Sequence, residues 1–195
     1  AEKRITGEVC VHHLWFNDSF YPTMGAKIKW NPAIKCENDR LALIRVLLDG
    51  KLDVVATDHA PHTLAEKNQS YFQSPSGGPL LQHSLVAMLE LAKQGYFTIE
   101  QVVEKMCHNP AIAFQINNRG FIREGYFADF AVVDLEAPFT VTPQNIAYQC
   151  GWSPFENTTF SSRVTHTFVN GKLVYKEGNY PFWEHNPAMP LSFNR

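Results

Sequence analysis

The segment from Asp53 to His62, with the sequence DVVATDHAPH, constrains the fold and the chemistry of this chain more than any other part. Its two valines are β-branched and favour a buried strand, and the proline near its end prevents that strand from continuing. The strand therefore delivers a carboxylate and two imidazoles to the same end of a sheet: Asp58, His59 and His62.

In α/β barrels and doubly wound sheets, the reacting groups lie at the carboxyl ends of the strands. A carboxylate is a hard oxygen ligand and a proton carrier, and imidazole acts as a ligand, an acid or a base. The simpler alternative is that Asp58 only caps the turn after the strand, and an isolated Asp-His pair favours that alternative. Three acid–base side chains within five residues make this simple capping role less favoured, so this strand end is a candidate site.

The flanking sequence alternates strands and helices, as in a parallel α/β sheet. A strand pattern at Ile5–Val11 is followed, further on, by a helix that Asn38 or Asp39 can cap and that Gly50 ends. A long polar loop then separates the central strand from later helices, and such loops are often functional. The other segments expected in this half are a loop at Asn17–Ala26, a short strand or extended piece at Lys27–Trp30, the polar loop at His62–Pro79, and helices at Leu80–Gln94, Thr98–Cys107 and Ala111–Ile116.

The second part of the chain is rich in strand patterns. Phe130–Leu135 is expected to be a strand, and Val164–Tyr175 predicts a hairpin with a type I′ turn at Asn170 and Gly171. A few strands alone are marginally stable in water, so this small β unit, from Gly125 to Tyr180, is expected to pair with strands from elsewhere.

The composition is that of a globular protein, with 45% hydrophobic and 18% charged residues among 195. A net charge of −2 supplies no field that would hold nucleic acid or an anionic membrane, so neither is an expected partner. No apolar stretch approaches transmembrane length. The cysteines form no CxxC pair and have no histidine in ligand spacing, which predicts reduced, mostly buried thiols of a cytoplasmic protein at Cys10, Cys36, Cys107 and Cys150.

With these elements placed, the chain resembles the dihydroorotase family of the amidohydrolase superfamily in the order and spacing of several segments. Ala56–His62 contains the TDHAPH signature of that family without a change, and Ile5–Leu14 resembles its seventh-strand segment. Lys29–Lys35 resembles its NPPLR segment, with Ala33 and Lys35 as departures. Each match is weak alone, but their common order makes the resemblance strong. The remaining matches are Ser74–Gly77, Gly125–Asp129 and Cys150–Phe155.

The resemblance implies an α/β fold, namely the C-terminal part of a (β/α)8 TIM-type barrel with part of a small β domain. Residues 1–120 would hold barrel strands seven and eight with the closing helices, and residues 121–195 would hold the C-terminal share of the β domain and a tail. The family site carries one or two divalent metals, usually zinc, and Asp58 is the single ligand position that this sequence matches, since it contains no His-x-His motif. We therefore expect that the chain starts inside a larger protein and is inactive and poorly soluble when expressed alone.

The family reaction is the reversible closure of N-carbamoyl-L-aspartate to L-dihydroorotate in pyrimidine biosynthesis. By resemblance, Asp58 is both a metal ligand and the general base, and His59 lies beside the metal or packs under the loop. The same resemblance supplies the substrate-binding candidates, of which Asn31 could instead be a plain turn residue before Pro32, and Ser76 and Gly77 could belong to a plain flexible loop. These candidates are Asn31, His62, Ser76 and Gly77.

Two other function classes remain open at this stage. Hydantoinases, dihydropyrimidinases and allantoinases share the fold and act on related cyclic amides. A non-catalytic homologue that serves as a scaffold for a partner enzyme is the second alternative. The sequence upstream of Ala1 would discriminate between them, and the resemblance leaves a homodimer open.

Overall fold

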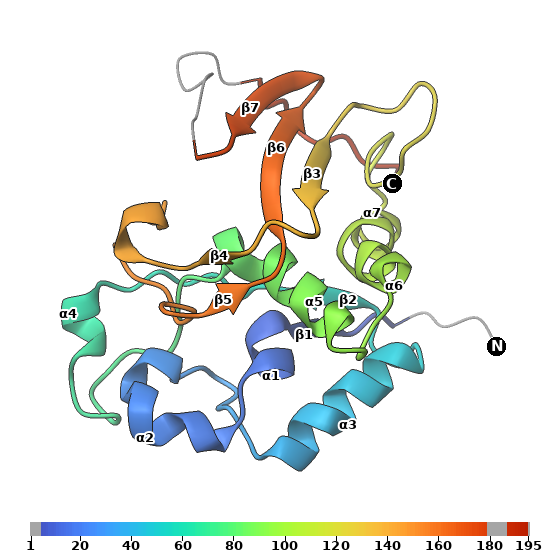
Figure 1. The fold of residues 1–195 in the computed structure, drawn as a ribbon. Helices are drawn as coiled ribbons and strands as arrows, with labels where there is room; N and C mark the ends of the chain where they lie inside the picture. The colour runs from blue at the N-terminus through green and yellow to red at the C-terminus, as the bar shows by residue number, and fades with distance from the viewer. Residues whose placement is uncertain (1–4, 179–186, 195) are drawn as a thin grey trace.

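The structure is a computed structural model that describes residues 5–178 and 187–194. Two short strands, β1 (Glu8–Cys10) and β2 (Val54–Ala56), pair in parallel, with Val9 opposite Val55. Helices occupy the connection between these strands (Figure 1). The parallel α/β pairing predicted for this half is therefore confirmed, although both strands are shorter than their sequence patterns.

Short helices replace the loop and the extended piece expected before residue 30. The ring of Phe16 lies 5.3 Å from that of Phe20 and 6.0 Å from that of Trp30, between ring centroids. This aromatic packing accompanies a 3₁₀ turn at Gly25–Ile28, so the strand interpretation of Lys27–Trp30 is wrong, although the backbone of Lys29 is extended. The elements here are α1 (Val11–Trp15), a 3₁₀ turn at Asp18–Phe20, α2 (Tyr21–Met24) and a second 3₁₀ turn at Gly25–Ile28.

Helix α3 (Glu37–Leu48) begins before either of the predicted caps, with Cys36 at its N-cap position. The carboxylate of Glu37 in the first turn accepts a hydrogen bond from the Asn17 side chain at 2.7 Å. This contact anchors the start of the helix to the segment before it, and an acidic first turn also suits the helix dipole. The predicted end is confirmed, because Gly50 follows with a φ of +70°.

Arg40 ties α3 to two neighbouring segments. Its side chain is buried and donates to the backbone carbonyl of Leu14 at 2.9 Å and to the Tyr96 hydroxyl at 3.1 Å. It also donates to both carboxylate oxygens of Glu37, at 2.8 and 2.6 Å. These hydrogen bonds lower the pKa of Glu37 to about 2. Such a network fixes α3 against α1 and against the turn that follows α5.

The polar segment after β2 is not entirely a loop. Helix α4 (Leu64–Lys67) begins at Thr63, whose hydroxyl accepts a hydrogen bond from the Glu66 backbone N–H at 3.3 Å. The Glu66 carboxylate accepts in return from the Thr63 backbone N–H at 2.7 Å. This reciprocal capping box stabilises a helix of one turn that hydrophobic periodicity could not reveal.

The later helices follow the predictions with one exception. A capping box of Thr98 and Gln101 starts α6 where the helix at Thr98–Cys107 was expected to begin, and Gly95 follows α5 with a φ of +87°. The gap expected between the helices at Thr98–Cys107 and Ala111–Ile116 is wrong, because helical residues continue from Ile99 to Ala113, with Pro110 in the first turn of α7. The elements are a 3₁₀ turn at Leu81–His83, α5 (Ser84–Lys93), α6 (Ile99–Val103), a π-helical turn at Glu104–His108 and α7 (Asn109–Ala113).

The second part forms a separate antiparallel sheet at one end of the molecule (Figure 1). Asn170 and Gly171 have φ values of +49° and +74°, which confirms the type I′ hairpin. Pairing of this unit with strands from elsewhere stays a prediction. The strands are β3 (Phe130–Asp134), β6 (Arg163–Val169) and β7 (Lys172–Lys176) in the order β3-β6-β7, and a second pair of β4 (Phe139–Thr140) and β5 (Thr159–Phe160).

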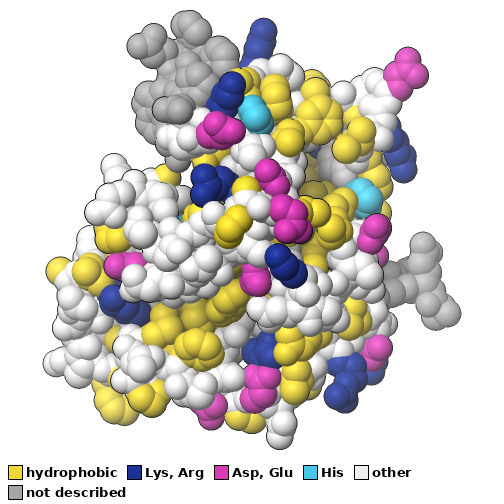
Figure 2. Space-filling model, in the orientation of Figure 1, with side chains coloured by type: hydrophobic (Ala, Val, Ile, Leu, Met, Phe, Trp, Pro, Cys, Tyr) yellow, Lys and Arg dark blue, Asp and Glu magenta, His cyan; other side chains and the backbone are white. Residues whose placement is uncertain are grey.

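One hydrophobic core joins the strands to the helices. It includes Val11 and Leu14 of α1, Leu47 of α3 and Met88 of α5, all fully buried. On the face drawn in Figure 2, acidic and basic side chains are interspersed, in keeping with the low net charge. Within residues 5–178 and 187–194, no helix is long and apolar enough to span a membrane.

The cysteine prediction needs one correction. All four thiols are free, but Cys36 and Cys107 are exposed, and the other two are only half-buried. They are therefore not the mostly buried thiols expected from their residue type.

We predict that Arg40→Met lowers the free energy of unfolding by about 2 kcal/mol, because it removes charge-assisted hydrogen bonds and leaves the Leu14 carbonyl unpaired. Urea denaturation of the protein at its native length measures the change. The matched control is Arg45→Met, which alters an exposed arginine on the same helix and should change stability little. Equal effects of the two substitutions would contradict the proposed anchoring role.

Candidate active site

Asp58 lies two residues beyond the end of β2, with a φ of +46°. An L-residue other than glycine rarely adopts this left-handed conformation, which costs on the order of 1 kcal/mol. Its side chain is exposed, and no hydrogen bond or ion pair from a described residue engages the carboxylate. The strand end thus presents a carboxylate that is free to act on a ligand.

Three segments far apart in sequence meet beside Asp58, and we call this arrangement the loop junction: residues 29–31, 58–62 and 74–78. The N–H of Gly77 donates to the Lys29 carbonyl at 2.9 Å, and the N–H of Ala60 donates to the Gly78 carbonyl at 3.2 Å. Gly78 also forms a parallel bridge with His59. The sequence-predicted Asp58, His59, His62, Asn31, Ser76 and Gly77 therefore all lie on segments that the backbone joins together.

Gly77 is required at its position by conformation and by space. Its φ is +119°, and a Cβ atom there would lie 2.6 Å from the Ala60 Cβ and 3.3 Å from the His62 Cδ2. Only glycine allows the backbone of this loop to approach the segment after β2 so closely. This contact places the Gly77 backbone directly beside the His62 ring.

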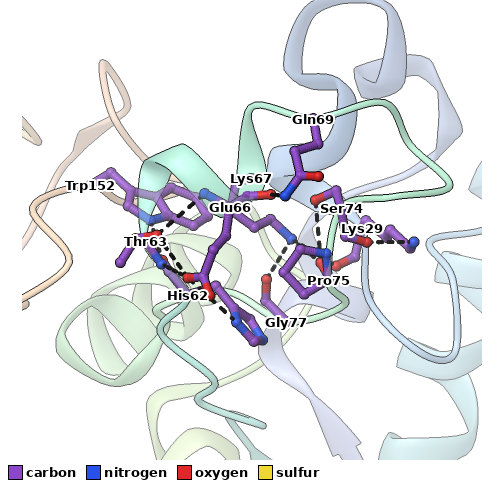
Figure 3. Close-up of polar contacts among 10 residues, drawn as sticks. All are labelled: Lys29, His62, Thr63, Glu66, Lys67, Gln69, Ser74, Pro75, Gly77 and Trp152. Carbon is purple, nitrogen blue, oxygen red and sulfur yellow. Dashed lines mark hydrogen bonds and ion pairs between the residues drawn. The ribbon is translucent and has the colours of Figure 1, made fainter.

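Trp152 fixes the main chain of His62 from the opposite side. The Trp152 indole is buried, and its Nε1–H donates to the His62 carbonyl at 2.8 Å (Figure 3). The half-buried His62 ring has its Nδ1 4.0 Å from a carboxylate oxygen of Glu66, which is one turn further along the chain. The imidazole of His62 therefore lies within the loop junction and forms only a long ion pair, to Glu66.

The hydrogen bonds of His59 determine its tautomer. Its Nδ1 accepts from the backbone N–H groups of Leu80 and Leu81, at 3.1 and 3.3 Å. The neutral ring must therefore carry its proton on Nε2, where it can donate to an anion. This arrangement supports a role in orienting a neighbouring group and disfavours direct metal ligation through Nδ1.

Asn31 and Ser76 are both exposed on the loop junction. Asn31 follows the buried Trp30, whose ring lies 3.0 Å from the position that a Cβ on Gly78 would occupy. The segments of Asn31 and Ser76 therefore run side by side, and both side chains are open to a ligand.

Lys67 and Lys29 hold the loop that contains Ser76, and both were missed in the sequence. Lys67 reaches from α4 to the carbonyls of Pro75 and Gly77, each at 2.8 Å (Figure 3). Lys29 donates to the Ser74 carbonyl at 2.6 Å. The capping box before Lys67 was the signal that could have placed it on a helix beside the loop.

The described residues supply one of the ligands that a metal ion beside Asp58 would need. An exposed carboxylate without a protein partner, at a strained strand end, is suited to a divalent cation. Among the described residues, Asp58 is the single proposed ligand at this position, so the remaining ligands would come from outside them.

A second group of possible ligands corrects the sequence analysis, which found no histidine in ligand spacing near a cysteine. Donor atoms of Cys10, His12 and His13 lie within 4.8 Å of one another. Burial, together with the charge of Asp58, raises the pKa of the Cys10 thiol to about 12 in the absence of a metal. The buried His12 ring stacks on Trp30 with ring centroids 4.3 Å apart, but neither of its ring nitrogens has a hydrogen-bond partner among the described residues, so this group could hold a metal ion.

A cavity of about 880 Å³ lies elsewhere, between α5 and the β3–β6–β7 sheet. Its lining includes Val86, Val164 and Tyr175 but none of the residues of the loop junction. Its walls are mostly apolar, which suits packing better than acid–base chemistry. The candidate active site is therefore the loop junction.

We predict that Gly77→Ala destabilises the protein more than Gly95→Ala does. Both glycines have positive φ values, but a Cβ at Gly95 meets no atom within 4 Å, whereas one at Gly77 overlaps Ala60. Denaturation midpoints of the two variants separate the steric effect from the conformational one. Equal midpoints would show that the loop does not pack as described.

Comparison with known proteins identifies the family. Residues 9–174 match the model of the amidohydrolase family. The dihydroorotase of Halalkalibacterium halodurans is 39% identical over 175 residues, covering 89% of this chain and 41% of that protein. The dihydroorotase of Bacillus caldolyticus is 38% identical over 176 residues, covering 90% of this chain and 41% of that protein. The chain thus spans about two fifths of the length of these relatives.

Solved structures agree on the fold. An L-hydantoinase (dihydropyrimidinase) from Arthrobacter aurescens superposes with a TM-score of 0.85 at 24% identity, covering 90% of this chain and 40% of that one. A D-hydantoinase superposes with a TM-score of 0.83 at 22% identity, covering 91% and 40%. These matches confirm the fold class expected from the sequence, part of a (β/α)8 TIM-type barrel with part of a small β domain. The chain belongs to the amidohydrolase family.

Proposed function

We propose that the protein carrying this chain is a dihydroorotase, which reversibly hydrolyses the cyclic amide of L-dihydroorotate to N-carbamoyl-L-aspartate in pyrimidine biosynthesis. The observation that carries the proposal is the loop junction, where the unchanged TDHAPH segment places a free carboxylate beside a glycine loop. Relatives named dihydroorotase, at 33–39% identity, support the same substrate class. The cytoplasmic location expected from the cysteines stays a prediction.

Asp58 is the proposed metal ligand and general base. Amidohydrolases generally depend on a metal, and zinc bound here would activate water and polarise the amide carbonyl. The exposed Asp58 carboxylate accepts the proton of the attacking water and returns it to the leaving amide nitrogen. The Nε2–H of His59 can donate a hydrogen bond to a neighbouring anionic group during this transfer and so stabilise it.

Four residues of the loop junction, Asn31, His62, Ser76 and Gly77, are proposed to bind the substrate. His62 and Asn31 offer donors for the carboxylate and a ring carbonyl, and the Ser76–Gly77 backbone approaches the ring. In this proposal, residues 1–120 belong to the barrel, and residues 121–195 belong to the small β domain and a tail. A homodimer remains a prediction without a surface assigned to it.

The main alternative is another cyclic amidohydrolase. The hydantoinase structures are at most 24% identical to this chain, so they support the fold but not a hydantoinase activity. The dihydroorotases are more similar in sequence, at up to 39% identity. The test is to compare the rates at which the protein, at its native length, hydrolyses L-dihydroorotate, hydantoin and dihydrouracil. A clear preference for L-dihydroorotate supports a dihydroorotase, and a preference for either of the others supports the alternative. Absence of turnover on all three would favour a non-catalytic scaffold.

We predict that Asp58→Asn lowers kcat in both directions by about 100-fold or more, because the amide cannot accept the proton. Circular dichroism should show an intact fold, since the side chain makes no structural hydrogen bond to a described residue. The matched control is Asp49→Asn, which alters an exposed carboxylate at the end of α3 and should retain full activity. Substantial residual activity of Asp58→Asn would reject the role.

We predict that His62→Ala and Asn31→Ala each raise KM for dihydroorotate by about tenfold, because each removes one hydrogen bond to the substrate. Zinc content, measured by atomic emission, should stay at the wild-type level. His166→Ala and Asn38→Ala, which lie away from the loop junction, serve as controls. Loss of metal from either site variant would show that it binds the ion instead.

A further inference from the structure

Lys67 is a buried cation whose described partners are all neutral. Its side chain is 1% exposed, and its Nζ donates to the carbonyls of Pro75 and Gly77, both at 2.8 Å, and of Lys29 at 3.4 Å. No carboxylate of a described residue lies within ion-pair distance of it, because the neighbouring Glu66 is engaged by Thr63. Burial and the charge of Lys29 lower the pKa of Lys67 to about 8. A buried ammonium without a counter-ion is costly, so its position calls for a functional explanation.

Pro75 and Gly77 are the residues on either side of Ser76, and the carbonyls of both accept hydrogen bonds from this ammonium. In a trans peptide, the carbonyl and the N–H point in opposite directions, so the Pro75 carbonyl directs the Ser76 N–H away from Lys67. Ser76 is exposed, and its N–H has no partner among the described residues. The Gly77 N–H is already taken by the Lys29 carbonyl. The Ser76 N–H is therefore an unpaired donor on the side of the loop that faces away from Lys67.

We propose that Lys67 is a positioning residue that orients the Ser76 N–H toward the carboxylate of an anionic substrate. The ammonium holds the Pro75–Ser76 peptide, which carries the Ser76 N–H, and the Gly77–Gly78 peptide, as Figure 3 shows for the carbonyls of Pro75 and Gly77, and it polarises each peptide along the carbonyl-to-N–H direction. Its charge also compensates for bringing an anion to the loop junction. This inference rests on the proposed function, because it takes the substrate to be a cyclic amide with a carboxylate.

Lys29 provides a matched comparison in the same loop. Its ammonium donates to the carbonyls of Tyr71 and Ser74, at 2.7 and 2.6 Å, and lies 5.1 Å from the centre of the Tyr71 ring. It therefore clamps the loop as Lys67 does, but it binds neither of the carbonyls that flank Ser76. A purely structural role predicts similar consequences for the loss of either side chain.

The test compares Lys67→Met with Lys29→Met in the protein at its native length. For Lys67→Met, KM for dihydroorotate should rise about tenfold or more, with kcat within about threefold of the wild type, because a charge-assisted contact is lost in binding. Lys29→Met should leave KM within about threefold. Lys67→Arg, which keeps the charge, should recover part of the lost affinity. Hydrogen exchange should speed up at Gly77 in Lys67→Met only.

The contrary outcomes are distinct from failure of the proposed function. If Lys67→Met keeps the wild-type kcat and KM for dihydroorotate, this inference is wrong but the proposed function stands. The same holds if Lys67→Met and Lys29→Met change KM by equal factors. A wild-type protein that does not turn over dihydroorotate rejects the proposed function and this inference with it. If Lys67→Met does not fold, Lys67→Gln replaces it, with the same expected rise in KM and the same overturning result.

Discussion

The candidate site depends on the backbone hydrogen bonds that join three loops at Gly77 and Gly78. Gly77 donates to the Lys29 carbonyl, and Gly78 accepts from Ala60, so segments separated by tens of residues become one surface. The absence of a side chain at Gly77 permits this approach, since a Cβ would lie 2.6 Å from that of Ala60. Without this contact, Asp58 would stand alone at a strand end.

Charge is distributed around the loop junction in a way that suits an anionic ligand. The Asp58 carboxylate is exposed, whereas the Lys67 ammonium is buried behind the loop and satisfied by carbonyls. The chain as a whole carries a net charge of −2, so long-range attraction cannot draw an anion to this site. In the proposed function, local donors provide the binding, and the Ser76 N–H is the backbone donor that we propose.

The sequence was sufficient for the features that follow from local patterns. The β2 strand, the Thr98 capping box and the Asn170-Gly171 turn are specified by a few adjacent residues, and the TDHAPH motif lies where we propose the active site. The turns before Trp30 were missed because tertiary contacts stabilise them, whereas the helix at Lys67 has a local signal, the capping box of Thr63 and Glu66. The pairing of loops at the junction joins residues distant in sequence, so no local pattern could predict it.

The central claim is that the loop junction binds the cyclic amide, and a crystal structure of the protein at its native length with L-dihydroorotate tests it most directly. The account predicts density for the ligand with its ring amide facing the Asp58 carboxylate and its own carboxylate at His62 and the Ser76 backbone. Density for the ligand in the cavity between α5 and the β3–β6–β7 sheet, with the loop junction occupied only by solvent, would contradict it.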